Sequence, residues 1–171
     1  NRIEAALLDG VKPEEIAFFS FSTTAVNEGL SRIVDRMKYK RSQFRYFKTL
    51  HAMAFYLLGL ETKQVISYGQ LRQFAKENDY RFPSVDYRTG VARYQTQDAV
   101  LLSQIDSSRL FGYSIREYFT KNHIEESIAR AEEMAQKYVR FKRSQGVVDF
   151  TDMILLANKQ EFDTPYFKYM F

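Results

Sequence analysis

The sequence predicts an α/β protein in which a parallel sheet is flanked by helices and interrupted by an inserted helical segment. The run from Ile16 to Phe21 is almost uninterruptedly apolar, as expected for a strand buried on both faces of a parallel sheet. It leads through a hydroxyl-rich turn into a helical pattern, and the same order of strand, hydroxyl and helix returns over residues 44–59. Between residues 61 and 122 the sheet-like pattern is absent, and short helical stripes follow one another.

The composition allows a sizeable hydrophobic core and argues against a metal site. The 171 residues are 45% hydrophobic and 16% aromatic, and 25 basic side chains against 21 acidic ones give a net charge of +4. A surplus of this size permits a polyanionic partner without demanding one. The absence of cysteine excludes disulfides and thiolate metal sites, and His51 and His123 lie far apart in the chain, so no metal site is expected.

Neither a membrane span nor a signal peptide is expected. No apolar run approaches the roughly 18 residues that a span needs, and the N-terminus lacks a charged-then-apolar pattern. We therefore expect a soluble, cytoplasmic protein. Both ends look cut from a longer protein, because Asn1 enters directly into a helical pattern and the aromatic run from Phe167 to Phe171 resembles a strand just beginning.

The first strand ends in a polar turn. Before the strand, a short stripe of Ile3, Leu7 and Leu8 predicts a helix that closes at Gly10. After the strand, Ser22, Thr23 and Thr24 precede an amphipathic helix, and Thr23 or Thr24 is its expected N-cap. The apolar stripe of that helix consists of Val26, Leu30, Ile33, Val34 and Met37.

This turn is a candidate binding site. In open α/β sheets, ligands bind beyond the carboxyl ends of the strands, where helix N-termini point outward. Hydroxyl groups there can hold a phosphate oxygen, and Phe21 can offer a flat face to a nucleobase. The alternative is that the hydroxyls only cap the helix and Phe21 only packs, since caps of this kind are common.

The segment from Lys38 to Lys48 is basic and aromatic. It holds five basic and four aromatic residues and no acidic one. Interleaved cations and rings are typical of a single-stranded nucleic-acid surface. The alternative is a solvated helix end followed by a strand over residues 44–48 with half of its rings in the core. Besides Lys48 at its end, the cations of the segment are Lys38, Lys40, Arg41 and Arg45.

A second strand–helix junction follows at Thr49. The helix after it carries apolar residues on one face and closes at Gly59. A lone histidine such as His51 is more often structural than catalytic. On the same sheet edge as Phe21, however, it can donate to a phosphate or stack on a base.

The inserted segment consists of short capped helices. Ser67, Thr96 and Ser114 are the expected N-caps of three of them, and residues 82–90 are an expected loop. The longest helix is predicted from His123 to Gln145. Its C-terminal turn carries Arg140, Lys142 and Arg143, where the helix dipole favours cations.

Two aspartates begin the next helix. Asp149 and Asp152 are three residues apart, which approximates a capping box before an apolar run. Local capping is favoured over catalysis for both carboxylates.

Three of these segments together resemble superfamily 1 DNA helicases of the UvrD/Rep/PcrA type. In that family a strand ends in Thr-Phe-Thr-Asn-Lys-Ala-Ala, and the matching run here is Ser20 to Gly29, with Arg32-Ile33 following. The second signature, Thr-Phe-His or Thr-Leu-His before a helix, is matched by Thr49-Leu50-His51-Ala52. The third, Val-Asp-Phe-x-Asp-Leu, is matched by the run from Val148 to Met153.

The resemblance covers essentially the whole chain and implies a partial RecA-like (P-loop NTPase) parallel sheet. Residues 1–60 and 147–171 are the expected pieces of that motor domain, and residues 61–146 are the expected α-helical subdomain inserted between them. Thr23 and Thr24 stand where the family usually has Asn and Lys, so one cation is missing from that turn.

The resemblance also implies a function. The parent protein is expected to be an ATP-dependent DNA helicase that uses Mg²⁺, moves 3′ to 5′ along single-stranded DNA and separates strands at a duplex junction. These 171 residues contain no Gly-x-x-x-x-Gly-Lys-[Ser/Thr] loop and no acidic pair placed for Mg²⁺. We therefore expect no catalytic residue, no cofactor and no ATPase activity in this chain alone.

By the same resemblance, the chain carries a surface that grips DNA. Phe21 is the expected base-stacking residue, Ser20, Ser22 and Thr23 are expected to contact the backbone, and Thr49 and His51 form a second grip. Weaker electrostatic candidates are Lys38, Lys40, Arg41, Arg45, Arg140, Lys142 and Arg143. Two alternatives stay open: a stand-alone nucleic-acid-binding module, and a helicase-like scaffold domain without ATPase activity.

Overall fold

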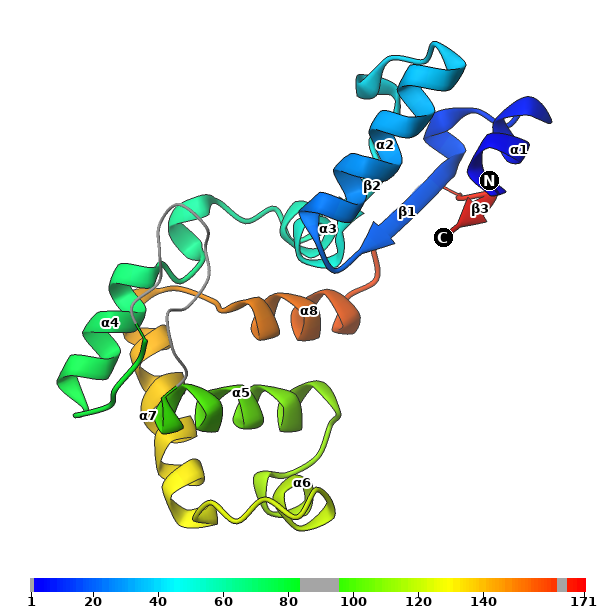
Figure 1. Cartoon of the computed structure of the whole chain (residues 1–171). Coiled ribbons are helices and arrows are strands. Elements are labelled where there is room, and N and C mark those ends of the chain that lie inside the picture. Colours follow the sequence, from blue (N-terminus) through cyan, green and yellow to red (C-terminus); the bar gives the residue numbers. More distant parts are fainter. Residues whose placement is uncertain (1, 84–95, 163–165) are drawn as a thin grey trace. The chain divides into compact units, whose positions relative to one another are not determined.

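The structure is a computed structural model that describes residues 2–83, 96–162 and 166–171. Two compact units are present, and each is described by itself (Figure 1). The sheet unit comprises Asn1–Leu60 and Met153–Phe171, and the helical unit comprises Glu61–Asp152.

The sheet unit contains three parallel strands in the order β2-β1-β3. Ser20 of β1 pairs with Thr49 of β2, and Ile16 pairs with Tyr169 of β3. The sheet-unit elements are α1 (Arg2–Leu8), the 3-10 turn η1 (Pro13–Glu15), β1 (Ile16–Ser20), α2 (Thr23–Met37), the 3-10 turn η2 (Arg41–Gln43), β2 (Phe47–Thr49), α3 (Leu50–Leu57) and β3 (Tyr169–Met170). The predicted strand at the end of the chain is therefore confirmed, as a short edge strand.

The core of the sheet unit lies between β1 and α2. Ile16 is fully buried, and α2 packs Val26, Leu30 and Ile33 into the same cluster, as its predicted stripe requires. Because α2 follows β1 through a tight turn, it runs back alongside the strand (Figure 1). The prediction of a strand buried on both faces holds only for its first two residues, since residues 18–20 are half-buried.

Three local predictions for the sheet unit are wrong. The N-cap of α2 is Ser22 rather than Thr23 or Thr24, and its Oγ accepts from the Ala25 amide at 3.1 Å. The second strand begins at residue 47 rather than 44, because residues 41–43 form η2 and the ring of Phe44 turns into the core. Leu8 does not join the first helical stripe and is exposed.

The helical unit consists of helices around an aromatic core. Phe74 and Phe119 are among its fully buried side chains, and the Phe74 ring lies 5.0 Å from the Tyr138 ring. The helical-unit elements are the 3-10 turn η3 (Thr62–Gln64), α4 (Tyr68–Glu77), α5 (Gln97–Leu110), α6 (Ile115–Lys121), α7 (Ile128–Gln145) and the first turn of α8 (Phe150–Lys159), which continues into the sheet unit.

Capping residues set the helix starts in this unit. Ser67, Thr96 and Ser114 each accept a hydrogen bond from the amide three residues later, which confirms the three predicted caps. The prediction that the longest helix starts at His123 is wrong, because Ser127 caps it and α7 begins at Ile128. His123 has a positive φ of 52°, just after α6 ends. Of the predicted loop, residues 84–90 lie outside the described residues.

The return from the helical unit differs from the predicted boundary at residue 147. Residues 147–152 still belong to the helical unit. Val148 forms a parallel bridge with Val65, and the Asp149 carboxylate binds the ammonium of Lys142, so both contacts hold this segment against helical-unit residues.

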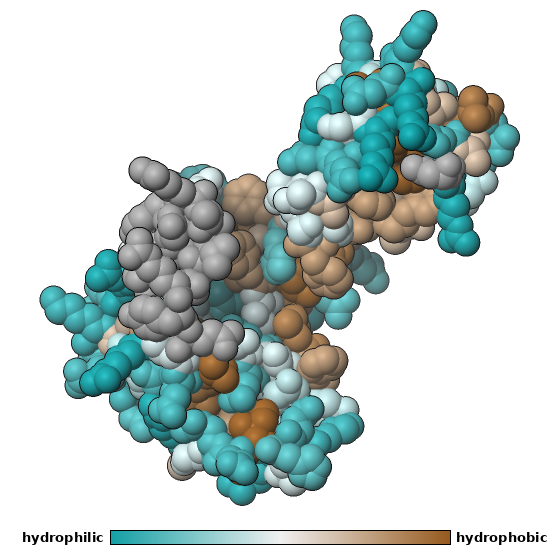
Figure 2. Space-filling model, viewed as in Figure 1, coloured by the Kyte–Doolittle hydropathy of each residue, from teal (hydrophilic) through white to brown (hydrophobic). Residues whose placement is uncertain are grey.

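The visible face of the molecule is mainly hydrophilic, with separate hydrophobic patches (Figure 2). Within the described residues, none of the helices has both the length and the apolar character that crossing a membrane requires.

Candidate nucleic-acid interface

The carboxyl ends of β1 and β2 lie side by side in the sheet unit. Ser20, the last residue of β1, is the register partner of Thr49, the last residue of β2. Residues 20–24 and 49–52 contain the ends of these two strands and the starts of the helices that follow them, and we call them together the rim. The structure thus brings together six predicted site residues: Ser20, Phe21, Ser22, Thr23, Thr49 and His51.

Two helices begin at the rim. Their first amides lack intrahelical acceptors, and the partial positive charge of each helix dipole is at this end. The hydroxyls of Ser22 and Thr49 each accept one of these amides, from Ala25 and Ala52, at 3.1 Å. A hydroxyl that accepts in this way keeps its own proton and can donate it to a phosphate oxygen. The rim sequence contains no acidic residue, so it presents donors without a repelling carboxylate.

Phe21 lies in the rim with its side chain in solvent. It is 85% exposed, although it directly follows a strand whose first residues are buried. Within the described structure Phe21 is therefore no core residue, and its ring is accessible to a ligand. Ser22 and Thr23 beside it are exposed, whereas Ser20, Thr49 and His51 are half-buried.

The basic segment after α2 lies mostly away from the rim. Lys38 caps the C-terminal end of α2. Because this helix is 15 residues long and rises 1.5 Å per residue, Lys38 lies about 22 Å from the helix start. Arg41 differs, because its guanidinium reaches back along α2, donating to Ser31 Oγ at 3.3 Å and to the Asn27 side chain. Lys40 and Arg45 are exposed.

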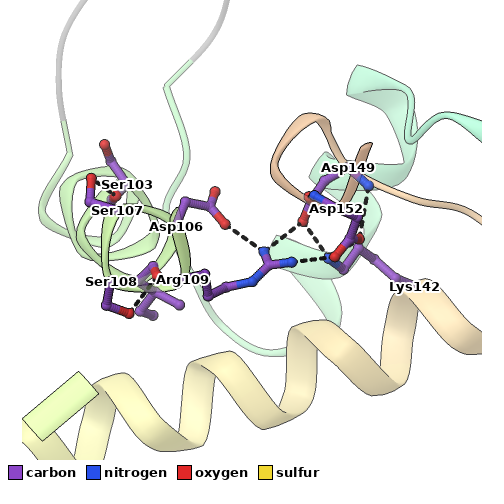
Figure 3. A network of polar contacts seen from close by, with 9 residues as sticks. Ser103, Asp106, Ser107, Ser108, Arg109, Lys142, Asp149 and Asp152 are labelled. Carbon is purple, nitrogen blue, oxygen red and sulfur yellow. Dashed lines mark hydrogen bonds and ion pairs between the residues drawn. The ribbon is translucent and has the colours of Figure 1, made fainter. Parts of the chain in front are cut away.

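Of the three predicted cations on α7, one is not on the surface. Arg140 and Arg143 are exposed, but Lys142 is only 4% exposed. Its Nζ donates to the carboxylates of Asp149 and Asp152 (Figure 3). The expectation that Lys142 contacts a nucleic-acid backbone is therefore wrong, because its charge is buried and paired.

Lys142 belongs to a buried polar network in the helical unit. Arg109 of α5 donates to Asp106 at 2.7 Å, to Asp149 at 3.2 Å and to Asp152 (Figure 3). The two cations and three carboxylates tie α5 and α7 to the start of α8. Buried charges are tolerated where they are paired and hydrogen-bonded in this way.

The two aspartates also cap α8, as predicted. The Asp152 amide donates to the Asp149 carboxylate at 2.6 Å, and the Asp149 amide donates to the Asp152 carboxylate at 3.1 Å. Sequence reasoning found this box but missed its cations, because Arg109 lies 40 residues before Asp149 and no local pattern links them.

The network shifts two carboxyl pKa values in opposite directions. Burial and the nearby Asp149 charge raise the pKa of Asp106 above its ordinary value, despite its ion pair with Arg109. Burial also acts to raise the pKa of Asp152, but hydrogen bonds from Lys142 and from the Asp149 amide outweigh it and lower that pKa.

In the described residues no group of three or more His, Cys, Asp or Glu side chains has an arrangement that holds a metal ion.

Comparison with known families gives a match. The family described as UvrD/REP helicase N-terminal domain matches residues 1–168, which include both rim turns and the helical unit. Searches of curated proteins and of solved structures returned no match.

Proposed function

Because this chain belongs to the UvrD/REP helicase N-terminal domain family, we propose that its rim binds single-stranded DNA as part of a DNA helicase. The observation that carries the proposal is the pairing of Ser20 with Thr49. It aligns two strand ends, two helix N-termini and one exposed aromatic ring on one edge of the sheet. Phosphates need donors and unpaired bases need aromatic faces, and both are offered here.

Each rim residue has a role in this proposal. Phe21 stacks on a base, because its ring is exposed and stacking requires no particular base. Ser20, Ser22 and Thr23 contact the sugar–phosphate backbone through hydroxyls and first-turn amides. Thr49 and His51 form the second grip, in which the imidazole donates to a phosphate or stacks on the next base.

Arg41 supplies a cation near the rim. The turn after β1 has Thr23 and Thr24 where the related helicases usually have Asn and Lys. Asn27, which accepts from the Arg41 guanidinium, lies four residues after Thr23, a rise of about 6 Å along α2. The Arg41 charge is therefore held about one helical turn from the start of the helix, within reach of a backbone that crosses the rim.

The wider activity is proposed for the protein that carries this chain. There, ATP hydrolysis with Mg²⁺ drives 3′ to 5′ movement along single-stranded DNA and strand separation at a duplex junction. The support for this step is family membership and the motif resemblance of the rim.

Replacing Phe21 tests the proposal. We expect Phe21→Ala to weaken binding of a fluorescently labelled single-stranded oligonucleotide by about 5- to 150-fold, which corresponds to roughly 1–3 kcal/mol for one stacked base. Because the ring is 85% exposed, the free energy of unfolding should change by less than about 0.5 kcal/mol.

Tyr166→Ala is the matched control. Tyr166 is an aromatic residue of the sheet unit with the same 85% exposure, but it lies outside the rim. The Tyr166→Ala variant should bind the oligonucleotide with the affinity of the unmodified chain. Unchanged oligonucleotide affinity in Phe21→Ala, or an equal loss of affinity in Tyr166→Ala, would refute the proposal that the rim binds single-stranded DNA.

A further inference from the structure

The helical unit carries a cleft beside α4 that the rim proposal does not use. Its volume is about 800 Å³, and it is lined by one face of α4 and by residues 80–82. Gly69, Arg72, Gln73 and Lys76 form the α4 face, with the i, i+3, i+4, i+7 spacing that places side chains on one side of a helix.

The cleft is positively charged. Arg72, Lys76 and Arg81 line it, all three are exposed, and none has an ion-pair partner within the residues that the structure describes. Other cations of the same unit, such as Arg109 and Arg130, are paired with carboxylates. Among the residues that the structure describes, no acidic side chain lines the cleft to offset the three charges.

Two nearby carboxylates, those of Asp98 and Glu77, are occupied elsewhere. Asp98 binds the Arg130 guanidinium and accepts from the Arg81 amide at 2.7 Å, and Glu77 accepts from Gln73 at 2.8 Å. The Arg81 carbonyl also accepts from the Thr96 hydroxyl. Both backbone groups of Arg81 are therefore fixed, so its side chain starts from a fixed position at the cleft edge.

An aromatic wall completes the cleft. Tyr80 and Phe82 line it, and both rings rest on the fully buried Phe74, with centroid distances of 5.5 and 6.3 Å. This stack makes the wall a part of the packed core rather than a loose segment.

We propose that this cleft binds the sugar–phosphate backbone of a nucleic-acid strand. Arg72 and Lys76 are four residues apart, so their charges are spread along about 6 Å of the helix, which suits successive phosphates better than one oxyanion. Unpaired cations beside aromatic side chains are the composition of a sequence-independent nucleic-acid groove. The inference stands on the helical unit alone and does not depend on the rim.

Salt-dependent binding tests it on the full chain. Anisotropy titrations use a labelled 20-nucleotide single strand and the matching 20-base-pair duplex at several salt concentrations. Each phosphate-bound cation contributes about 0.7 to 0.9 to the slope of log affinity against log salt. The double variant Arg72→Gln/Lys76→Gln should therefore reduce that slope by about 1.4 to 1.8 with the strand type that occupies the cleft.

Two controls separate the cleft from general charge and from folding. Arg116→Gln removes one positive charge from an exposed position on α6 of the same unit and should leave the slope nearly unchanged. Arg72→Lys keeps the charge and should keep the slope. Because both α4 cations are exposed, the thermal midpoint of the double variant should match that of the unmodified chain.

The outcomes distinguish this site from the rim. Phe21→Ala removes stacking and leaves the salt slope unchanged, whereas the α4 double variant lowers the slope. A lowered slope with normal Phe21→Ala binding supports the cleft and rejects the rim. Wild-type affinity and slope of the double variant with both DNA forms would overturn the cleft, as would equal losses in Arg116→Gln. The proposal would also be overturned if the double variant released a bound poly-glutamate peptide but bound DNA with unchanged affinity and slope.

Discussion

Replacing Lys142 by methionine tests whether the buried network holds the helical unit together. Methionine keeps most of the side-chain length but removes the ammonium that binds Asp149 and Asp152. Because the Lys142 and Asp149 side chains are only 5% and 7% exposed, water cannot replace the lost cation at Asp149. The carboxylates would then share Arg109 alone.

The expected cost follows from this geometry. Breaking a buried pair by removing one partner costs about 3–5 kcal/mol, because it leaves a buried charge uncompensated. Arg109 still binds both aspartates, so we expect the lower end, about 3 kcal/mol. For a chain of this length, that corresponds to a fall in Tm of roughly 6–12 °C.

Thermal unfolding followed by circular dichroism measures this effect at pH 7 and again at lower pH. In the unmodified chain the hydrogen bond from Lys142 lowers the pKa of Asp152, and this contribution to stability is lost as the pH falls below 3.8 through the lowered pKa, so the difference in Tm between Lys142→Met and the unmodified chain should shrink at low pH. Lys137→Met is the matched control, because Lys137 pairs with Glu133 on the exposed side of the same helix and should leave the Tm unchanged. A Tm of Lys142→Met equal to that of the unmodified chain at pH 7 would refute the reasoning.

Three further predictions concern single groups. Asp152→Asn should destabilise the chain by about 1–3 kcal/mol at pH 7, and this difference should disappear as the pH falls below 3.8 through the lowered pKa of Asp152. Asp106→Asn should instead stabilise the chain at pH 7, because the pKa of Asp106 is raised and its ionised form costs stability. Urea titrations at pH 3 and pH 7 compare the two variants, and a pH-independent effect of both would contradict the assignment. Ser22→Ala should cost about 1 kcal/mol through loss of the α2 cap, while Thr24→Ala should cost less, and the reverse order in urea unfolding would contradict the observed cap.

Local features of the fold could be predicted because their causes lie within a few residues. Ser67 and Ser114 cap helices through amides three residues away, so the sequence around each cap contains all the partners. The stripe of α2 likewise reports its buried face through its own spacing.

Competition between local choices explains the errors at element ends. Ile124 fits the apolar stripe of the longest helix, but the Ser127 hydroxyl accepts from the Arg130 amide and begins α7 later. Ser22, Thr23 and Thr24 are chemically similar caps, and the end of β1 at Ser20 selects the first of them. Sequence alone does not fix such a choice among neighbours.

Features that depend on distant residues could not be predicted. The basic last turn of α7 suggested a solvated cation at Lys142, whereas its partners are two carboxylates at the start of α8, those of Asp149 and Asp152, and its burial depends on packing between helices. The α4 cleft also escaped prediction, because Arg72 and Arg81 come together only when the segment after α4 folds back along it. The rim could be anticipated, because both turns follow strands of one parallel sheet and such strands end at the same edge.

Photocrosslinking tests the rim most directly. A single-stranded oligonucleotide with iodouracil at one position is irradiated with the full chain, and the crosslinked residues are identified by mass spectrometry. We expect crosslinks at Phe21 and His51, and their loss at position 21 in Phe21→Ala. Crosslinks confined to residues outside 20–24 and 49–52 would contradict the proposal that this edge of the sheet binds the strand.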